Sequence, residues 1–213
     1  MKHIKLLSLF LLIASVSFGQ LSFGDKVGLN MSNLSIEGNS DLKSKIGLDF
    51  GFYAEYGLND QFSIQLPLMY TTKGAKQKSG GVTYRTALDY VELQPNIIYK
   101  KTVKNNAFFA LVGAYYAPFA FGTYKASKKV LGPKGDSKTQ TINMGRGKDD
   151  EMKSTDFGLN LAVGIDMKNN GRFGIQYELG LMNISNAEEG SAKNGSFSIF
   201  FTTPLNFGKK KNS

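Results

Sequence analysis

The sequence contains no cysteine, and its only histidine is His3, close to the N-terminus. Without cysteine the chain has neither disulfides nor thiolate metal ligands, which excludes a small secreted fold held together by disulfides. Without a histidine further along, the Ser-His and Cys-His nucleophilic sites and the usual zinc ligand sets are excluded too. We therefore expect no enzyme, no catalytic residues, no metal site and no cofactor.

The sequence also lacks an apolar run long enough to cross a membrane as a helix, which takes about 20 residues. Its longest apolar run, Leu6–Phe18, has 13 residues and follows a basic start that includes Lys2 and Lys5. The run ends in small residues up to Gly19, as at a signal-peptidase site. This arrangement predicts a secretory signal peptide over residues 1–19, which is removed on export.

The remaining chain suits a single domain, which we place at residues 20–208 ahead of a basic, periplasmic tail at 209–213. Without the signal segment the chain has 24 basic and 17 acidic residues, a net charge of +7. A basic balance favours anionic partners. Because the protein is exported, anionic lipid or a surface ligand fits this charge, and nucleic acid does not.

Large apolar residues alternate with small or polar residues over long stretches of the chain. A period of two is the signature of a β-strand with two different faces. The predicted strands match the roughly 9–11 residues that a tilted strand needs to cross a bilayer. There are eight of them: Phe23–Met31, Ile46–Tyr56, Phe62–Tyr70, Ala87–Lys100, Ala107–Gly122, Asp156–Met167, Arg172–Ile184 and Gly195–Phe207.

The predicted connections alternate between short and long. The short ones are Leu58–Gln61, Lys101–Asn106 and Lys168–Gly171, and the long ones are Ser32–Ser44, Lys73–Thr86, Thr123–Thr155 and Ser185–Asn194. Short turns at one rim and long loops at the other are typical of outer-membrane barrels. An even number of strands then places both termini at the short-turn, periplasmic rim.

The apolar parity must face outward if the fold is a small barrel. An eight-stranded barrel is only just wide enough inside for side chains to fill, and it has no room for the many Phe, Tyr and Leu residues on this parity. Such a face is tolerable only in lipid, where closing the barrel satisfies the backbone. Leu161 therefore faces lipid and Asn160 the lumen, so Leu161→Arg should destabilise the barrel and Asn160→Arg should be tolerated.

Aromatic residues mark both the apolar face and the short-turn rim. In the fifth strand we expect Phe109, Leu111, Tyr115, Phe119 and Phe121 to lie on the apolar, outward face. Aromatics near the short-turn rim are candidates for an interfacial girdle. These are Tyr56, Phe62, Tyr99, Phe109, Phe173 and Phe207.

Five acidic residues fall on the small and polar parity, and we expect them to form a polar cluster in the lumen: Asp49, Glu55, Glu92, Asp166 and Glu178. Inward acids usually pair with inward lysines or arginines and fill the lumen. An alternative is that Glu92 and Glu178 form a glycosidase dyad. We favour the first interpretation.

The third long loop, Thr123–Thr155, has eight basic and four acidic residues. One interpretation is an anion-binding surface, for example for the phosphates of lipopolysaccharide. The alternative is a solvated, mobile loop. The candidate anion-binding residues are Lys125, Lys128, Lys129, Lys134, Lys138, Arg146 and Lys148.

Several segments resemble one known family. Asp89–Tyr99 resembles the fourth strand of the PorT-like outer-membrane β-barrels of Bacteroidota, and Lys26–Ser32, Phe157–Ile165 and Tyr177–Ser185 resemble other strands of that family. Gln94 is a departure, because the family commonly has proline directly after the Glu-hydrophobic pair. The resemblance implies an outer-membrane location in a Gram-negative bacterium and no particular activity.

The sequence thus predicts an all-β fold, an eight-stranded antiparallel up-and-down transmembrane β-barrel, present as a monomer. For its role we expect a plugged small barrel with surface-exposed binding loops. A porin-like narrow pore for ions or small solutes remains an alternative. A soluble secreted lipid-binding barrel is another, since alternation by itself does not say which face meets water.

Overall fold

The computed structural model describes residues 21–37, 41–104, 106–132, 135–145, 147, 149–167, 171–187 and 190–205. The predicted signal peptide and basic tail lie outside the described residues. No helix in these ranges is long and apolar enough to span a membrane.

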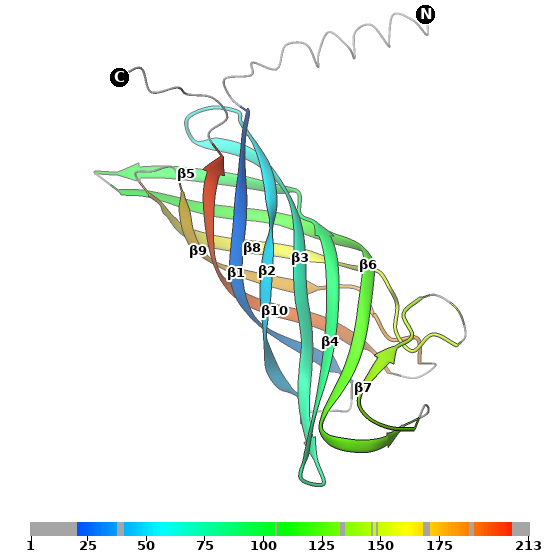
Figure 1. Cartoon of the computed structure of the whole chain (residues 1–213). Coiled ribbons are helices and arrows are strands. Elements are labelled where there is room, and N and C mark those ends of the chain that lie inside the picture. The colour runs from blue at the N-terminus through cyan, green and yellow to red at the C-terminus, as the bar shows by residue number, and fades with distance from the viewer. Residues whose placement is uncertain are drawn as a thin grey trace, which may run out of the picture.

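The described strands form one antiparallel sheet that closes on itself (Figure 1). The strands are β1 (Leu21–Ile36), β2 (Lys43–Gly57), β3 (Phe62–Ser79), β4 (Val82–Leu93), β5 (Asn96–Val103), β6 (Asn106–Gly132), β7 (Gly135–Ile142), β8 (Asp156–Asp166), β9 (Arg172–Gly180) and β10 (Ala192–Leu205). Closure comes from β1, which pairs with both β2 and β10. Because β4 and β5 share one place in the ring and β7 pairs only with β6, the ring has eight places, and the predicted eight-stranded barrel is confirmed.

The fourth place in the ring is split at Gln94 and Pro95. Proline has no N–H to give to a neighbouring strand, so the ladder is interrupted there. The gap is bridged by the backbone N–H of Gln94, which donates to the carbonyl of Pro67 (2.9 Å), and by the carbonyl of Pro95, which accepts from Ala114 (3.1 Å). β3 therefore pairs first with β5 and then with β4, and the ring stays closed.

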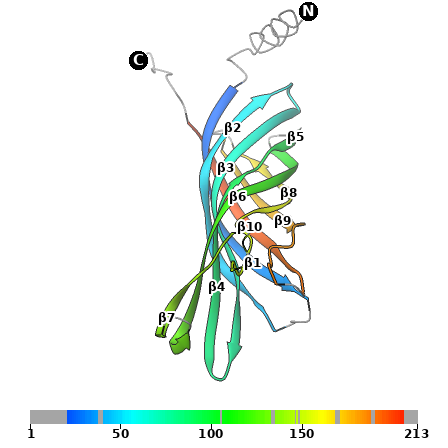
Figure 2. The same cartoon turned by 90° about the vertical axis from the view of Figure 1, so that its right-hand side faces the viewer.

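Two of the predicted long loops are largely strand. β3 and β4 continue to a tight turn at Gly80 and Gly81, whose φ angles of 55° and 73° suit the type I′ hairpin that glycine favours. β6 continues to pair with β7. Together, residues 76–85, 123–132 and 135–141 form a projection of the sheet past the barrel, here called the blade (Figure 2).

The start of β1 and the end of β10 lie at the opposite rim. Phe23 pairs with Leu205, and Leu21 pairs with Tyr56 beside the short turn at residues 58–61. This is the arrangement that the alternation of loop lengths predicts.

The outer wall of the barrel is apolar. Ile46 is 69% exposed, and Phe52 and Phe121 are each 66% exposed, whereas most side chains on the other parity are buried in the lumen. A continuous apolar wall of this extent has no place in water and fits the hydrocarbon of a bilayer. The outward assignment of the apolar parity is confirmed on most of the barrel.

The prediction was wrong for the first half of β6. Phe109, Leu111 and Tyr115 point inward, with at most 6% exposure. The cause is a bulge: Val91 lies opposite Phe119, but Leu93, two residues further along, lies opposite Tyr116. The extra residue at Ala117–Pro118 flips the parity, as bulges do. Outward positions before the bulge are held instead by Phe108, Val112 and Tyr116.

The predicted aromatic girdle is changed by the same bulge. Phe62 and Tyr99 lie side by side at the short-turn rim, with ring centroids 5.2 Å apart, and Phe173 is exposed on the same wall. Phe109 is not part of it, because its ring lies in the lumen. Phe207 lies outside the described residues.

Inward glycines make room for the inward aromatics. A Cβ on Gly158 would come within 2.4 Å of the Tyr115 ring, and one on Gly164 within 2.7 Å of the Phe109 ring. The rings therefore lie directly over bare backbone. This pairing of large with absent side chains is how a narrow barrel holds aromatic residues inside.

We expect Gly158→Ala to destabilise the barrel by about 1–3 kcal/mol, because the new methyl group overpacks against the Tyr115 ring and the backbone. Gly195→Ala is the matched control. Its Cβ would meet nothing closer than 3.9 Å, so it should be neutral or stabilise by about 0.4–1 kcal/mol. Urea unfolding of both variants in vesicles measures the difference, and equal effects would contradict this packing.

Candidate functional site

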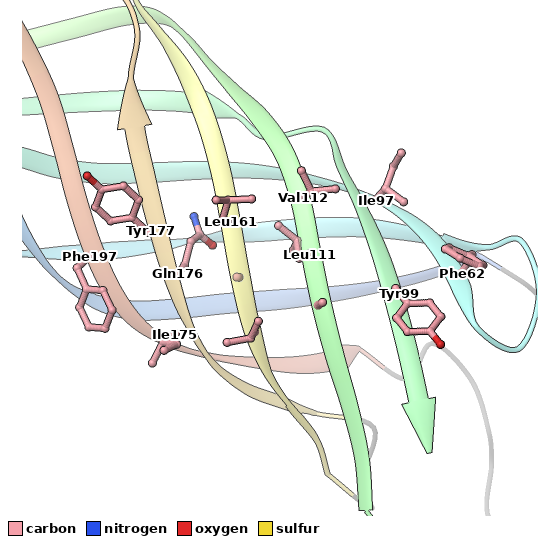
Figure 3. Close-up of a pocket in the computed structure, with 13 residues that line it drawn as sticks. Phe62, Ile97, Tyr99, Leu111, Val112, Leu161, Ile175, Gln176, Tyr177 and Phe197 are labelled. Carbon is pink, nitrogen blue, oxygen red and sulfur yellow. The ribbon is translucent and has the colours of Figure 1, made fainter. Parts of the chain in front are cut away.

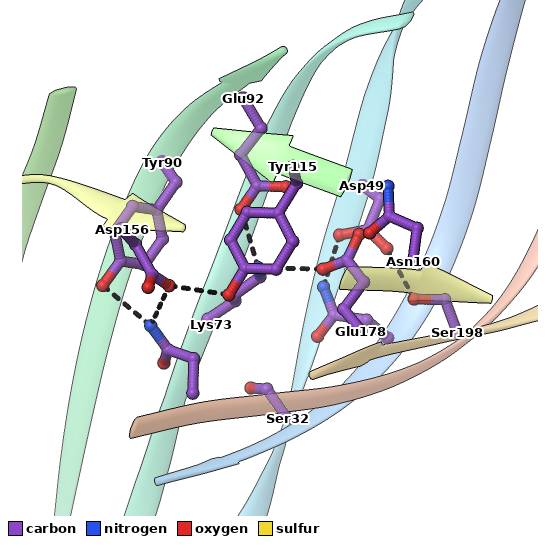
Figure 4. Close-up of polar contacts among 12 residues, drawn as sticks. Ser32, Asp49, Lys73, Tyr90, Glu92, Tyr115, Asp156, Asn160, Glu178 and Ser198 are labelled. Carbon is purple, nitrogen blue, oxygen red and sulfur yellow. Dashed lines mark hydrogen bonds and ion pairs between the residues drawn. The ribbon is translucent and has the colours of Figure 1, made fainter. Parts of the chain in front are cut away.

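The centre of the lumen holds a buried cation between two carboxylates (Figure 4). The Lys73 Nζ atom lies 2.7 Å from Glu92 Oε1 and 2.8 Å from Glu178 Oε2, and all three side chains are almost wholly buried. Gln94 Nε2 donates to both carboxylates at 2.9 Å. Each carboxylate is thus paired with a cation and accepts a hydrogen bond from an amide, and a buried charge requires both kinds of partner.

The polar network continues along the barrel from this centre. Gln176 donates to Glu178 (2.7 Å), and Lys26 Nζ donates to Gln176 (2.6 Å). The Lys26 ammonium also lies 4.6 Å from the centroid of the Phe200 ring. Asp49, one of the predicted lumen acids, accepts hydrogen bonds from Asn30 and Ser198.

A second group lies toward the blade. Asp156 accepts hydrogen bonds from the Tyr115 hydroxyl (3.0 Å) and from Asn194 Nδ2 (2.7 Å), and Asn194 also donates to the Tyr90 hydroxyl (3.0 Å). The Lys73 ammonium lies 3.9 Å from the centroid of the Tyr115 ring, which links this group to the centre.

A third group lies near the short-turn rim. Both terminal nitrogens of Arg172 donate to the Glu55 carboxylate, in the bidentate geometry typical of strong arginine–carboxylate pairs. Lys100 Nζ lies 2.8 Å from Glu55 Oε1, and Arg172 Nε donates to Asp166 at 2.8 Å. The structure therefore distributes the five predicted lumen acids along the barrel and does not gather them in one cluster.

Sequence analysis named most of the acids but not their partners, and four omissions stand out. Lys73 falls in a segment predicted as loop, Tyr115 was assigned to the outer wall, and Asp156 and Tyr90 were not singled out. A signal for Lys73 was present: it continues the inward parity of Gln65, Met69 and Thr71 along β3.

The packed lumen leaves little space. The space beside Lys26, Asp49 and Glu178 has no room for a water molecule. Glu92 and Glu178 share one lysine and are buried, so they offer no access to a sugar substrate. Among the described residues, no group of three His, Cys, Asp or Glu side chains is placed to hold a metal ion.

The mouth beside the blade is covered by residues 143–145, 149–155 and 181–187. Met152 bridges to Met144 and Ser185, and the backbone N–H of Lys153 donates to the carbonyl of Ile184 (2.8 Å). Ile184 is fully buried in an apolar cluster with Leu34, Leu88 and Ile142. The predicted loop Thr123–Thr155 is thus two structures, one arm of the blade and a cap on the barrel.

The predicted anion-binding residues that the structure describes are exposed, and they do not all lie on one face. Lys125 and Lys128 are exposed on β6. Lys138 is exposed on β7, next to Thr139, which pairs with Lys125, so alternation places Lys138 on the opposite face from Lys125. Lys134, Arg146, Lys148 and the side chain of Lys129 lie outside the described residues.

One hollow belongs to the outer wall. It has a volume of about 580 Å³, and its lining includes the outward side chains of Ile97, Val112, Leu161 and Tyr177 from β5, β6, β8 and β9 (Figure 3). Its lining is almost entirely apolar and continues the wall on either side. We assign it to contact with lipid chains.

Several solved barrels are similar in outline. Ail, the attachment invasion locus protein of Yersinia pestis, solved in complex with the heparin analogue sucrose octasulfate, is 13% identical, over 87% of this chain and 99% of Ail, with a TM-score of 0.47. Neisserial surface protein A is 16% identical, over 87% and 99%, with a TM-score of 0.46. OprG from Pseudomonas aeruginosa is 13% identical, over 88% and 95%, with a TM-score of 0.41. Similarities at this level say nothing about role.

No curated protein matches the sequence. The model of the outer membrane protein beta-barrel domain matches residues 14–186, most of the chain. That match agrees with the closed eight-place ring and its apolar outer wall. The chain belongs to the family of outer membrane protein beta-barrel domains.

Proposed function

We propose that this protein is a plugged, non-conducting outer-membrane barrel that presents its blade at the cell surface to bind an anionic ligand. It acts as a monomer, without cofactor or catalysis, and reaches the membrane through a signal peptide at residues 1–19. Within the family we place it with the PorT-like barrels of Bacteroidota. The observation that carries the plugged state is the Lys73–Glu92–Glu178 cluster, which fills the centre of the lumen.

Two further features support a closed barrel. The Glu55–Arg172–Lys100 group fills the lumen nearer the short-turn rim, and the apolar cap around Ile184 and Met152 covers the other mouth. An ion would have to pass all three layers. Each of them is held by contacts between segments far apart in the sequence, so none opens by a single side-chain rotation.

We expect the purified protein to be silent in planar bilayers. Inserted barrels should give no steady, reproducible conductance steps at moderate voltage, and insertion is checked separately by protease protection in vesicles made from the same lipid. Steady openings of constant size would overturn the plugged state and favour the narrow pore.

We also expect the protein to behave as an integral membrane protein. It should stay in the membrane fraction after a carbonate wash and run faster on gels before heating than after it, because the closed barrel resists detergent. Release by carbonate would instead favour the soluble, lipid-binding alternative.

The proposed anionic ligand is supported by the charge of the blade. Lys76, Lys78 and Arg85 of the β3–β4 hairpin and Lys125 and Lys128 of β6 all lie on this projection. Clustered cations of this kind attract anions and raise the rate at which they associate.

A further inference from the structure

Three cations lie side by side in adjacent strands of the blade. The strand registers place Lys76 of β3 opposite Arg85 of β4, and Arg85 opposite Lys125 of β6. We call these three residues the cationic row. Directly paired residues of antiparallel strands point to the same face, so their charges face one way.

This arrangement opposes the stability of the sheet unless something compensates it, because like charges directly across a strand pair repel. None of the three forms an ion pair within the part of the chain that the structure describes. Asp89, which pairs with Thr72, is an acid on the same face, but it lies two rows away from the cationic row. Four residues along a strand correspond to about 13 Å, which exceeds the screening length of about 8 Å at physiological salt.

The cationic row continues the lipid-facing wall. Along that face, from the barrel towards the tip of the blade, paired residues of β3, β4 and β6 follow one another in rows. The first row is Tyr70, Val91 and Phe119, the second is Thr72, Asp89 and Phe121, the third is Gly74, Ala87 and Thr123, and the fourth is the cationic row. Phe121 is the last large apolar side chain in this series. With strands tilted by about 35–45°, the cations lie on the order of 10 Å above it, within reach of the polar headgroups.

A hollow opens beside two of these cations. It has a volume of about 330 Å³, and Thr83, Arg85, Lys125, Ala126 and Ser127 line it. The Ser127 hydroxyl accepts a hydrogen bond from the Thr83 backbone N–H (3.0 Å), which ties the two strands together at its edge. The lining offers a planar guanidinium, an ammonium group and a hydroxyl, which are the donors that bind phosphate oxygens.

We propose that the cationic row binds the phosphate groups of a phosphorylated glycolipid in the outer leaflet, seated against the barrel wall. The proposal rests on the proposed function, since it names the ligand and the place of its anionic site. The continuity of the row with the apolar wall selects a lipid over a soluble anion: the acyl chains lie on the wall below Phe121 while the phosphates reach Arg85 and Lys125.

The test is retention of lipid A by the full barrel in phosphatidylcholine vesicles. Bis-phosphorylated lipid A is added at increasing mole fraction, the barrel is extracted gently, and bound lipid is counted by native mass spectrometry. Arg85→Gln with Lys125→Gln should raise the half-saturating fraction about 25-fold, since each cation near a membrane surface contributes roughly fivefold. Dephosphorylated lipid A should bind equally weakly to both proteins.

The matched control removes two exposed cations elsewhere on the outer surface, Lys101→Gln in β5 with Lys193→Gln in β10. It has the same net charge as the test variant and should retain lipid A like the wild type. An equal loss in the control would overturn the proposal, because net charge alone would then explain binding. Unchanged retention in the test variant would overturn it as well.

Two further measurements use a single variant and a soluble anion. Arg85→Gln alone should shift binding about fivefold, and heat-modifiable migration checks that every variant is folded. If soluble polyphosphate binds the row as tightly as lipid A does, the proposal that the ligand is a lipid is overturned, and only the broader proposal of an anionic ligand stands. Absence of binding to either probe would overturn both, whereas the conductance experiment tests the plugged state independently.

Discussion

Lys73→Met is expected to destabilise the barrel by about 3–5 kcal/mol, one of the two largest effects of a single substitution that the structure predicts. The variant leaves Glu92 and Glu178 buried beside each other without their shared cation. Methionine fills a similar volume, so the loss comes from charge and not from a cavity. The measurement is urea unfolding in vesicles at neutral pH, where the free energy of unfolding is compared with that of the wild type.

The control removes the acids together with the lysine. Lys73→Met combined with Glu92→Gln and Glu178→Gln removes all three charges of the central cluster together, and replacing a buried ionic group as a whole is often neutral. We expect most of the stability to return. If the triple variant is as unstable as Lys73→Met, the site is sensitive to packing and not to its charges.

Acidification should rescue the single variant. Without Lys73 the two buried carboxyls are held together at close range, so protonating them relieves the repulsion between them. The difference in stability between Lys73→Met and the wild type should therefore shrink as the pH falls. A gap that stays constant with pH would show that the lysine acts through packing.

Alternation in the sequence was enough to predict the barrel because one face of each transmembrane strand contacts lipid and the other contacts the polar lumen. Where this contrast ends, the signal ends too. Beyond Tyr70 the outward positions of β3 become Thr72, Lys76 and Lys78, so both faces turn polar although the strand continues to Ser79. Lys73 was therefore placed in a loop, and the cation of the central cluster was missed.

The partners of the inward acids depend on registers that no local pattern contains. Parity places Glu92 and Glu178 inside, but their common partner comes from a third strand and depends on the shear of the closed barrel. The bulge at Ala117–Pro118 is equally hidden, because Phe109 and Phe119 are both aromatic and look alike to a count of apolar residues. Pro118 was the available signal, since proline inside a strand marks bulges.

Leu161→Arg is expected to cost about 2–4 kcal/mol, because it places a cation at the middle of the lipid-facing wall. Leu161 is 54% exposed on β8, halfway between Phe157 and Ile165. Ile165→Arg is the matched control, since it puts the same side chain on the same strand near the short-turn rim. Close to the interface the cost falls to about 0–1 kcal/mol.

Asn160→Arg no longer serves as the tolerated variant that the sequence suggests. The Asn160 side chain is fully buried and donates to Asn96 and to the carbonyl of Ala114, both at 3.3 Å. Arginine there overpacks a filled lumen and buries an unpaired charge, so it should also be costly.

Measurements in bilayers of different thickness distinguish the destabilisation by Leu161→Arg from the destabilisation by Asn160→Arg. A thinner bilayer brings the interface closer to Leu161 and lets the new arginine reach water, so the penalty for Leu161→Arg should fall in short-chain lipid. The penalty for Asn160→Arg arises inside the protein and should not change. Equal costs for Leu161→Arg and Ile165→Arg at every thickness would mean that this wall does not cross the membrane in the orientation described.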